Sequence, residues 1–138
     1  MGKSSGSVIV GVVFSCLALS IGESVSAVSA EWAIPQEAEA LANPIAPSQE
    51  SRGRGAMIFS RRCAVCHGEN GRGDGPSSLS LGVRPTDLTG QAVFAQSNGR
   101  LFWKISIGRG PMPSWDVVMS EEDRWHVINY LRALPTAP

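Results

Sequence analysis

The sequence predicts a mostly α-helical protein with long loops. Three observations support this. A segment near the C-terminus has the signals of a capped amphipathic helix, and a second capped segment leads into a cysteine pair. No stretch of alternating apolar and polar residues is long enough to suggest a sheet. The chain has 138 residues, 43% of them hydrophobic, which suits one small domain. Its 12 basic and 12 acidic residues balance, so the composition gives no indication of nucleic-acid binding.

Residues 1–30 are typical of an export signal peptide. Lys3 precedes a short apolar stretch at 8–21, and small residues follow, ending at Ala30. A membrane-spanning helix needs about 20 apolar residues, so this stretch is short for one. An uncleaved membrane anchor remains the alternative. Cleavage after Ala30 would remove Cys16 and leave a mature chain whose two cysteines both lie at 63–66.

Residues 31–47 and the segment after them differ in character. The first, E-W-A-I-P-Q-E-A-E-A-L-A-N-P-I-A-P, is rich in Ala and Pro and predicts an extended leader. We place the folded domain at 48–135. Its first helix begins at Ser48, a favourable N-cap, and runs to the cysteines. Gly55 costs this helix about 1 kcal/mol relative to Ala and lies on the same face as Phe59. Close approach of another helix would explain the glycine, although an ordinary amphipathic helix is also consistent.

The last helix has the clearest signals in the chain. Ser120 is its N-cap, acidic residues fill its first turn at 121–123, and Pro135 ends it. Its apolar stripe consists of Val127, Ile128, Leu131 and Leu134. We expect this helix to pack on the first one. Between them the sequence indicates a glycine-rich loop at 68–75, a proline-containing segment at 84–89 and a short helix at about 98–107.

The motif C-A-V-C-H at 63–67 restricts the chemistry. A structural zinc ion takes four protein ligands, usually in two pairs, and His126 is the one further nitrogen donor of this kind. A thiol-redox motif belongs to a βαβ pattern, which this sequence lacks. Covalent haem requires two cysteines one turn apart followed directly by a histidine. Export also leads to a compartment where idle thiols oxidise. The motif therefore favours haem c over zinc and over thiol exchange.

The chain resembles the class I mono-haem c-type cytochromes of bacterial respiratory chains, including subunits of haem–copper oxidases and of quinol-oxidising complexes. The resemblance covers about residues 43 to 134. It rests on the following motifs: A-N-P (42–44), G-A-M-I-F (55–59), C-A-V-C-H-G-E-N-G-R-G-D-G-P (63–76), P-T-D-L-T (85–89), L-F-W-K-I-S-I-G (101–108), M-P-S-W (112–115) and R-W-H-V-I-N-Y-L-R-A-L (124–134).

The resemblance implies a class I cytochrome c fold, in which the two terminal helices cross and loops surround one covalent haem. The crossing would bring Gly55 and Phe59 against Tyr130. The haem would sit edge-exposed in a cleft, with a histidine and a methionine as axial ligands. Cys63 and Cys66 would attach it, and His67 would bind the iron. The resemblance also implies a location in the periplasm or at the periplasmic face of the inner membrane.

Met112 is our candidate for the second axial ligand. Pro111 and Pro113 stiffen the backbone on both sides of it, and the thioether sulfur is a haem-iron ligand that raises the potential. We expect Met57 and Met119 to pack in the core, and His126 to be a partly exposed helical histidine with no ligand role.

Further expectations concern the residues that would surround the haem. The carbonyl of Pro76 is the candidate acceptor for the His67 ring N–H, and Arg84 or Arg109 the candidate partner of a propionate. We expect the haem pocket to be lined by Leu101, Trp103, Ile105 and Trp115.

The predicted function is electron transfer by one covalent haem c, either as a periplasmic carrier or as a subunit of a membrane respiratory complex. With both axial positions filled by the chain, no site would be open to a substrate, so we do not expect an enzyme. The partners would be redox proteins or such a complex, with membrane association possible. The alternative is a haem with a labile sixth ligand, acting in catalysis or gas sensing. A zinc or thiol-redox domain is a third hypothesis.

Overall fold

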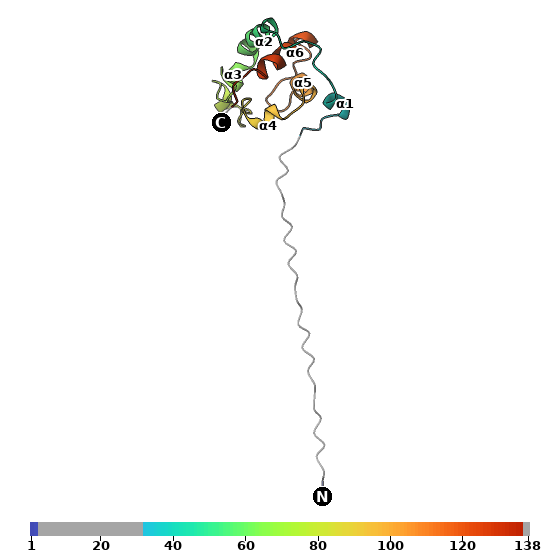
Figure 1. Cartoon of the computed structure of the whole chain (residues 1–138). Coiled ribbons are helices and arrows are strands. Elements are labelled where there is room, and N and C mark those ends of the chain that lie inside the picture. The colour runs from blue at the N-terminus through green and yellow to red at the C-terminus, as the bar shows by residue number, and fades with distance from the viewer. Residues whose placement is uncertain (3–31, 137–138) are drawn as a thin grey trace. The chain divides into compact units, whose positions relative to one another are not determined.

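The computed structural model describes residues 1–2 and 32–136 (Figure 1), so the predicted signal peptide lies almost wholly outside the described residues. From Trp32 onward the chain forms one compact unit. Its elements are α1 (Gln36–Glu39), α2 (Gln49–Arg62), α3 (Ala64–His67), the 3-10 turn η1 (Ser78–Ser80), α4 (Gln91–Phe94), α5 (Asn98–Ile107) and α6 (Glu121–Leu131). The described residues contain no strand beyond an isolated bridge between Arg109 and Met112. The mostly α prediction is confirmed. None of the described helices is long and apolar enough to cross a membrane.

Serine caps begin the three longest helices. The hydroxyl oxygens of Ser48, Ser97 and Ser120 each accept a hydrogen bond from the backbone N–H three residues further on, at 3.0–3.1 Å. These bonds satisfy one of the N–H groups that a helix start leaves without a partner. The predicted starts of the first and last helices, and both ends of the short helix, are confirmed. The last helix ends earlier than expected, at Leu131, because Arg132 is already its C-cap.

The most extensive contact between described helices is the crossing of α2 and α6, which lie near the top of Figure 1. At the contact Gly55 lies so close to α6 that a β-carbon there would stand 2.1 Å from the backbone oxygen of His126 and 2.8 Å from Cβ of Tyr130. One turn later the rings of Phe59 and Tyr130 pack with their centroids 5.2 Å apart. Gly55 therefore costs helix propensity but permits the approach of the two backbones. The expected crossing is confirmed.

A polar cluster inside the same contact corrects one expectation. His126 is buried, with 7% of its surface exposed, whereas we expected partial exposure. Its Nδ1 lies 2.8 Å from the hydroxyl of Ser51, which also accepts a hydrogen bond from the Asn129 side chain at 2.8 Å. These partners offset the cost of burying polar groups. His126 is thus engaged between α2 and α6.

Two apolar clusters fill the interior. The first joins Phe59, Ala64, Met119, Val127, Leu131 and Leu134, and the second joins Val93, Leu101, Trp125 and Ile128. Met119 belongs to the core, as expected. Met57 does not: 58% of its surface is exposed, so its predicted core position was wrong. It lies on the face of α2 opposite the buried residues Gly55 and Phe59, which pack against α6.

The segment before Ser48 is only partly extended. It contains α1, whose Ala38 is buried. A β-carbon on Gly99, in the first turn of α5, would stand 2.0 Å from the backbone oxygen of Ala38. Further along, the side chains of Asn43 and Asn129 bond at 2.9 Å. The predicted leader therefore packs against the domain through several contacts, and its description as extended was too simple.

Candidate functional site

The cysteine motif forms a tight helical turn at the end of α2. Cys63 is the C-cap of α2 and the N-cap of α3, so Cys63, Cys66 and His67 lie on successive turns of nearly continuous helix. The end of this helix leaves backbone carbonyls without partners. The glycine-rich loop supplies them: Val65, Cys66 and His67 accept hydrogen bonds from the N–H groups of Ser77, Gly75 and Gly73 at 2.8–3.1 Å. The loop thereby fixes the turn that carries the sulfurs.

Two glycines of that loop are required by close backbone contact. A β-carbon on Gly75 would stand 2.5–2.6 Å from backbone atoms of Ala64, Val65 and Cys66. Gly73 has φ of +74°, and its β-carbon would lie 2.2 Å from the backbone oxygen of Pro85. The loop is thus pressed between the cysteine turn and the segment at 85–89.

That segment orients His67. The ring Nδ1 of His67 lies 3.1 Å from the backbone oxygen of Thr86. Because a carbonyl oxygen only accepts hydrogen bonds, Nδ1 carries the proton and Nε2 keeps its lone pair for a metal. Burial also lowers the pKa of His67, which favours the neutral ring that a metal ligand needs.

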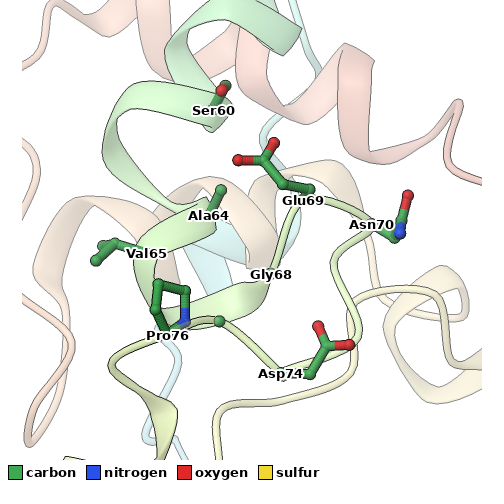
Figure 2. Close-up of a pocket in the computed structure, with 9 residues that line it drawn as sticks. Ser60, Ala64, Val65, Gly68, Glu69, Asn70, Asp74 and Pro76 are labelled. Atoms are coloured by element: carbon green, nitrogen blue, oxygen red, sulfur yellow. The ribbon is translucent and has the colours of Figure 1, made fainter.

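The expected acceptor, Pro76, was wrong. Pro76 lines a separate pocket together with Ala64, Val65 and Asp74, shown in Figure 2. In the D-G-P sequence the N–H of Gly75 donates to the oxygen of Cys66, whereas the His67 ring bonds to the oxygen of Thr86. Thr86 lies in the P-T-D-L-T motif, but nothing local to 63–67 indicates which loop returns to the ring.

Cys63, Cys66, His67 and Met112 line one cavity of about 490 Å³. Cys63 and Cys66 are half-buried thiols with no disulfide between them. Burial, and then the neighbouring Cys66, raises the pKa of Cys63 to about 12, so this thiol is protonated at neutral pH. Of the four expected lining residues Trp115 is present, whereas Leu101, Trp103 and Ile105 are not. Arg84 and Arg109, the candidate partners of a propionate, also line the cavity. Leu101 instead lies in the apolar core.

Met112 is carried by a tight turn. Its backbone N–H donates to the oxygen of Arg109 at 3.1 Å, and the Arg109 N–H donates to the oxygen of Met112 at 2.9 Å. Gly108 and Gly110 both have positive φ, of +66° and +57°. A β-carbon on Gly108 would stand 2.4 Å from the backbone of Pro113. Gly108 and Gly110 therefore help the two prolines to hold the turn. The motif G-R-G at 108–110 contains both glycines, but this role was not predicted.

The residues present fit a covalent porphyrin. Two thiols stand at the wall of a cavity that also receives a neutral imidazole, with its proton directed away on Nδ1, and a thioether turn. Arg62, Arg84 and Arg109 line the same cavity and provide cationic side chains of the kind that pair with carboxylates. No group of three or more metal-binding side chains that would suit a zinc ion occurs in the described residues.

Taken with the helix crossing, this cavity defines a class I c-type cytochrome, a protein whose cofactor is covalently bound haem c and whose work is electron transfer. The sequence profile of the family described as "Cytochrome C oxidase, cbb3-type, subunit III" matches residues 51–131. The chain belongs to this family.

Relatives and solved structures agree with that assignment. The chain is similar to the Cbb3-type cytochrome c oxidase subunit CcoP of Azospirillum brasilense, with 33% identity over 63 residues, which are 45% of this chain and 21% of that subunit. It is also similar to cytochrome c6 of Euglena gracilis, with 27% identity over 56% of this chain and 85% of that protein. The crystal structure of cytochrome CL from Methylophaga aminisulfidivorans shares the fold, with a TM-score of 0.52, 19% identity, and coverage of 64% of this chain and 55% of that one. The chain thus spans about a fifth of the oxidase subunit.

Proposed function

We propose that this protein transfers single electrons through one haem c that is attached by Cys63 and Cys66 and whose iron is bound by His67 and Met112. The observation that carries the proposal is that His67 and Met112, far apart in sequence, line one cavity with both cysteines. When bound, the haem supplies reversible one-electron chemistry at iron. The chain's own part is to fill both axial positions, so that no position remains for a substrate.

Each proposed ligand is held by its own backbone network. Thr86 keeps the proton of His67 on Nδ1, which leaves Nε2 as the iron ligand and raises its basicity. The paired hydrogen bonds between Arg109 and Met112 hold the thioether turn in one conformation. A thioether ligand favours Fe(II) and raises the reduction potential. Rigid ligands also keep the reorganisation energy between the Fe(II) and Fe(III) states small.

The partners follow from the relatives. One relative is a subunit of an oxidase, and the other is a small cytochrome of which this chain covers most. We therefore propose that the protein works as a periplasmic carrier between redox proteins or as a subunit of a membrane respiratory complex at the periplasmic face. The predicted export signal at 1–30 agrees with either location.

Replacing Met112 by Ala tests the ligand assignment. We expect the variant to lose the sulfur-to-iron charge-transfer band in the red part of the oxidised spectrum. The ferrous form should bind carbon monoxide, because one axial position is open, and the reduction potential should fall, because the ligand that favours Fe(II) is gone. Absorption spectra and a redox titration measure all three properties.

Met57→Leu is the matched control. Met57 is exposed and does not line the cavity, so this variant removes a sulfur without touching the site. It should behave as the wild type. A Met112→Ala protein with an unchanged red band would show that Met112 is not a ligand. If the wild type lacked the band and His126→Ala changed the spectrum strongly instead, the polar cluster between α2 and α6 would have to open onto the iron, and the ligand pair would be two histidines.

A further inference from the structure

Trp32 lines the haem cavity, although it stands ahead of the family domain. The family match begins at residue 51, so nothing in the family assignment covers residue 32. Trp32 nevertheless shares the cavity with Cys66, His67 and Met112. Its ring is half-buried and therefore occupies a position between the cavity and solvent.

Three side chains of the second half of the chain pack on this ring. Trp103 meets it edge to face, with centroids 6.0 Å apart and an angle of 82°. The guanidinium carbon of Arg109 lies 4.7 Å from the ring centroid, and the amine of Lys104 lies 5.6 Å from it. Both cations are within the range of a cation–π contact. The ring is thus held by aromatic and cationic contacts at once.

The contact between Trp32 and Arg109 links the ring to the turn that carries Met112. Arg109 exchanges two backbone hydrogen bonds with Met112, so a ring that holds the Arg109 side chain also restrains the turn that presents the thioether. Trp32 would therefore act on Met112 through Arg109, as a positioning residue, while its own ring closes part of the cavity.

A clamp a few residues further on keeps Trp32 in place. The carboxylate of Glu39 pairs with the guanidinium of Arg100 at 2.7 Å and accepts a hydrogen bond from the Ser97 hydroxyl at 3.3 Å. Beside it, Gly99 permits backbone contact with Ala38. Both contacts join α1 to the first turn of α5. The segment that carries Trp32 is thus tied to the domain on its C-terminal side.

We propose that residues 32–39 form a strap that makes Trp32 a wall of the haem cavity and a support of the Met112 turn. The support of Met112 rests on the proposed function, whereas the wall does not. An apolar wall lowers the access of water to the iron, and exclusion of water is one of the means by which a protein tunes a reduction potential. The strap would therefore make the first residues after the predicted cleavage site part of the cofactor site.

The test compares Trp32→Ala with Trp32→Phe in the exported holoprotein. Trp32→Ala should change the Soret-region circular dichroism, which reports aromatic rings beside the haem, and should lower the reduction potential. It should also raise the rate of carbon monoxide binding to the ferrous form about fivefold, since the lost contacts are of the size of an exposed cation–π pair. Trp32→Phe keeps an aromatic face, so its dichroism, potential and carbon monoxide binding rate should all stay close to those of the wild type.

A matched pair in α1 tests the clamp. Glu39→Gln and Glu37→Gln each remove one charge from α1, but of these two side chains it is Glu39 that pairs with Arg100. Glu39→Gln should lower the potential by part of the Trp32→Ala shift, and Glu37→Gln should not. If Trp32→Ala fails to mature, Glu39→Gln and its control Glu37→Gln carry the test alone.

The outcomes separate the two proposals. Unchanged Soret dichroism and potential in Trp32→Ala, or a potential in Glu39→Gln equal to that in Glu37→Gln if this pair stands alone, overturn the strap, whatever the sixth ligand is. A wild-type protein without the red charge-transfer band would instead overturn Met112 as ligand. The Soret and potential shifts in Trp32→Ala would still test whether Trp32 is a wall of the haem cavity.

Discussion

Single residues at the helix crossing show how a local cost is recovered by tertiary contact. Gly53 and Gly55 both weaken α2 by about 1 kcal/mol relative to Ala. They differ in what surrounds them: Gly53 has no atom within 4 Å of the position of a β-carbon, whereas Gly55 faces the backbone of His126 at 2.1 Å. Only Gly55 is therefore required by the fold.

The two glycines give a matched pair of substitutions. Gly55→Ala should destabilise the protein by about 1–3 kcal/mol, because overpacking forces α2 and α6 apart. Gly53→Ala should stabilise it by about 1 kcal/mol, because the site is open and Ala is the better helix former. Urea unfolding of both holoproteins measures the difference. Equal effects of the two substitutions would refute the close crossing.

The segment 85–89 supports His67, the proposed iron ligand. The side chain of Asp87 accepts hydrogen bonds from the Thr89 hydroxyl at 2.6 Å and from the Thr89 N–H at 2.8 Å. The N–H of Leu88 donates to the oxygen of Gly71 at 2.7 Å. Together these bonds fix the loop from which Thr86 reaches His67.

The Asp87 turn predicts a pH dependence. The hydrogen bonds from Thr89 hold the pKa of Asp87 below its ordinary value of 3.8. A carboxyl group whose folded pKa is lowered contributes stability above the ordinary value and loses it as the pH falls through the folded value. Asp87→Ala should therefore lower the melting temperature at pH 7, and the difference from wild type should shrink as the pH falls below about 4.

Asp116→Ala is the control for that measurement. Asp116 is exposed, and its carboxylate has no hydrogen bond in the described part of the chain. Its removal should change the melting temperature little at either pH. A gap between Asp87→Ala and wild type that stays constant down to pH 2 would show that the turn does not depend on the carboxylate.

The elements differ in how far the sequence could predict them. Serine caps predicted the starts of α2 and α6, because these signals are local, and the range of α5 was also predicted. The acceptor of the His67 proton could not be predicted, since it depends on how the loop at 85–89 returns past Gly73. Trp32 was also missed as a cavity residue. Its segment reads as a leader, and its contacts lie about 70 residues away in sequence.

At the scale of the whole molecule, export and haem attachment belong together. The predicted signal ends close to the strap, so processing determines which residues precede Trp32. We expect the mature N-terminus at Glu31, or at Val28 if cleavage follows Ala27. The intact mass of protein purified from its host should equal one of these chains plus one haem. A product that keeps residues 1–27 in the membrane fraction would show an anchor and favour a fixed complex subunit.

We propose that the chain fills both axial positions of one covalent haem iron and therefore transfers electrons. Exposure of the dithionite-reduced wild-type protein to carbon monoxide, followed by absorption spectroscopy, tests this most directly. A closed iron predicts a ferrous spectrum that changes slowly or not at all, because the ligand on the Met112 turn must first leave. Rapid and complete formation of the carbon monoxide complex would show that one axial position is open and would favour chemistry at the iron.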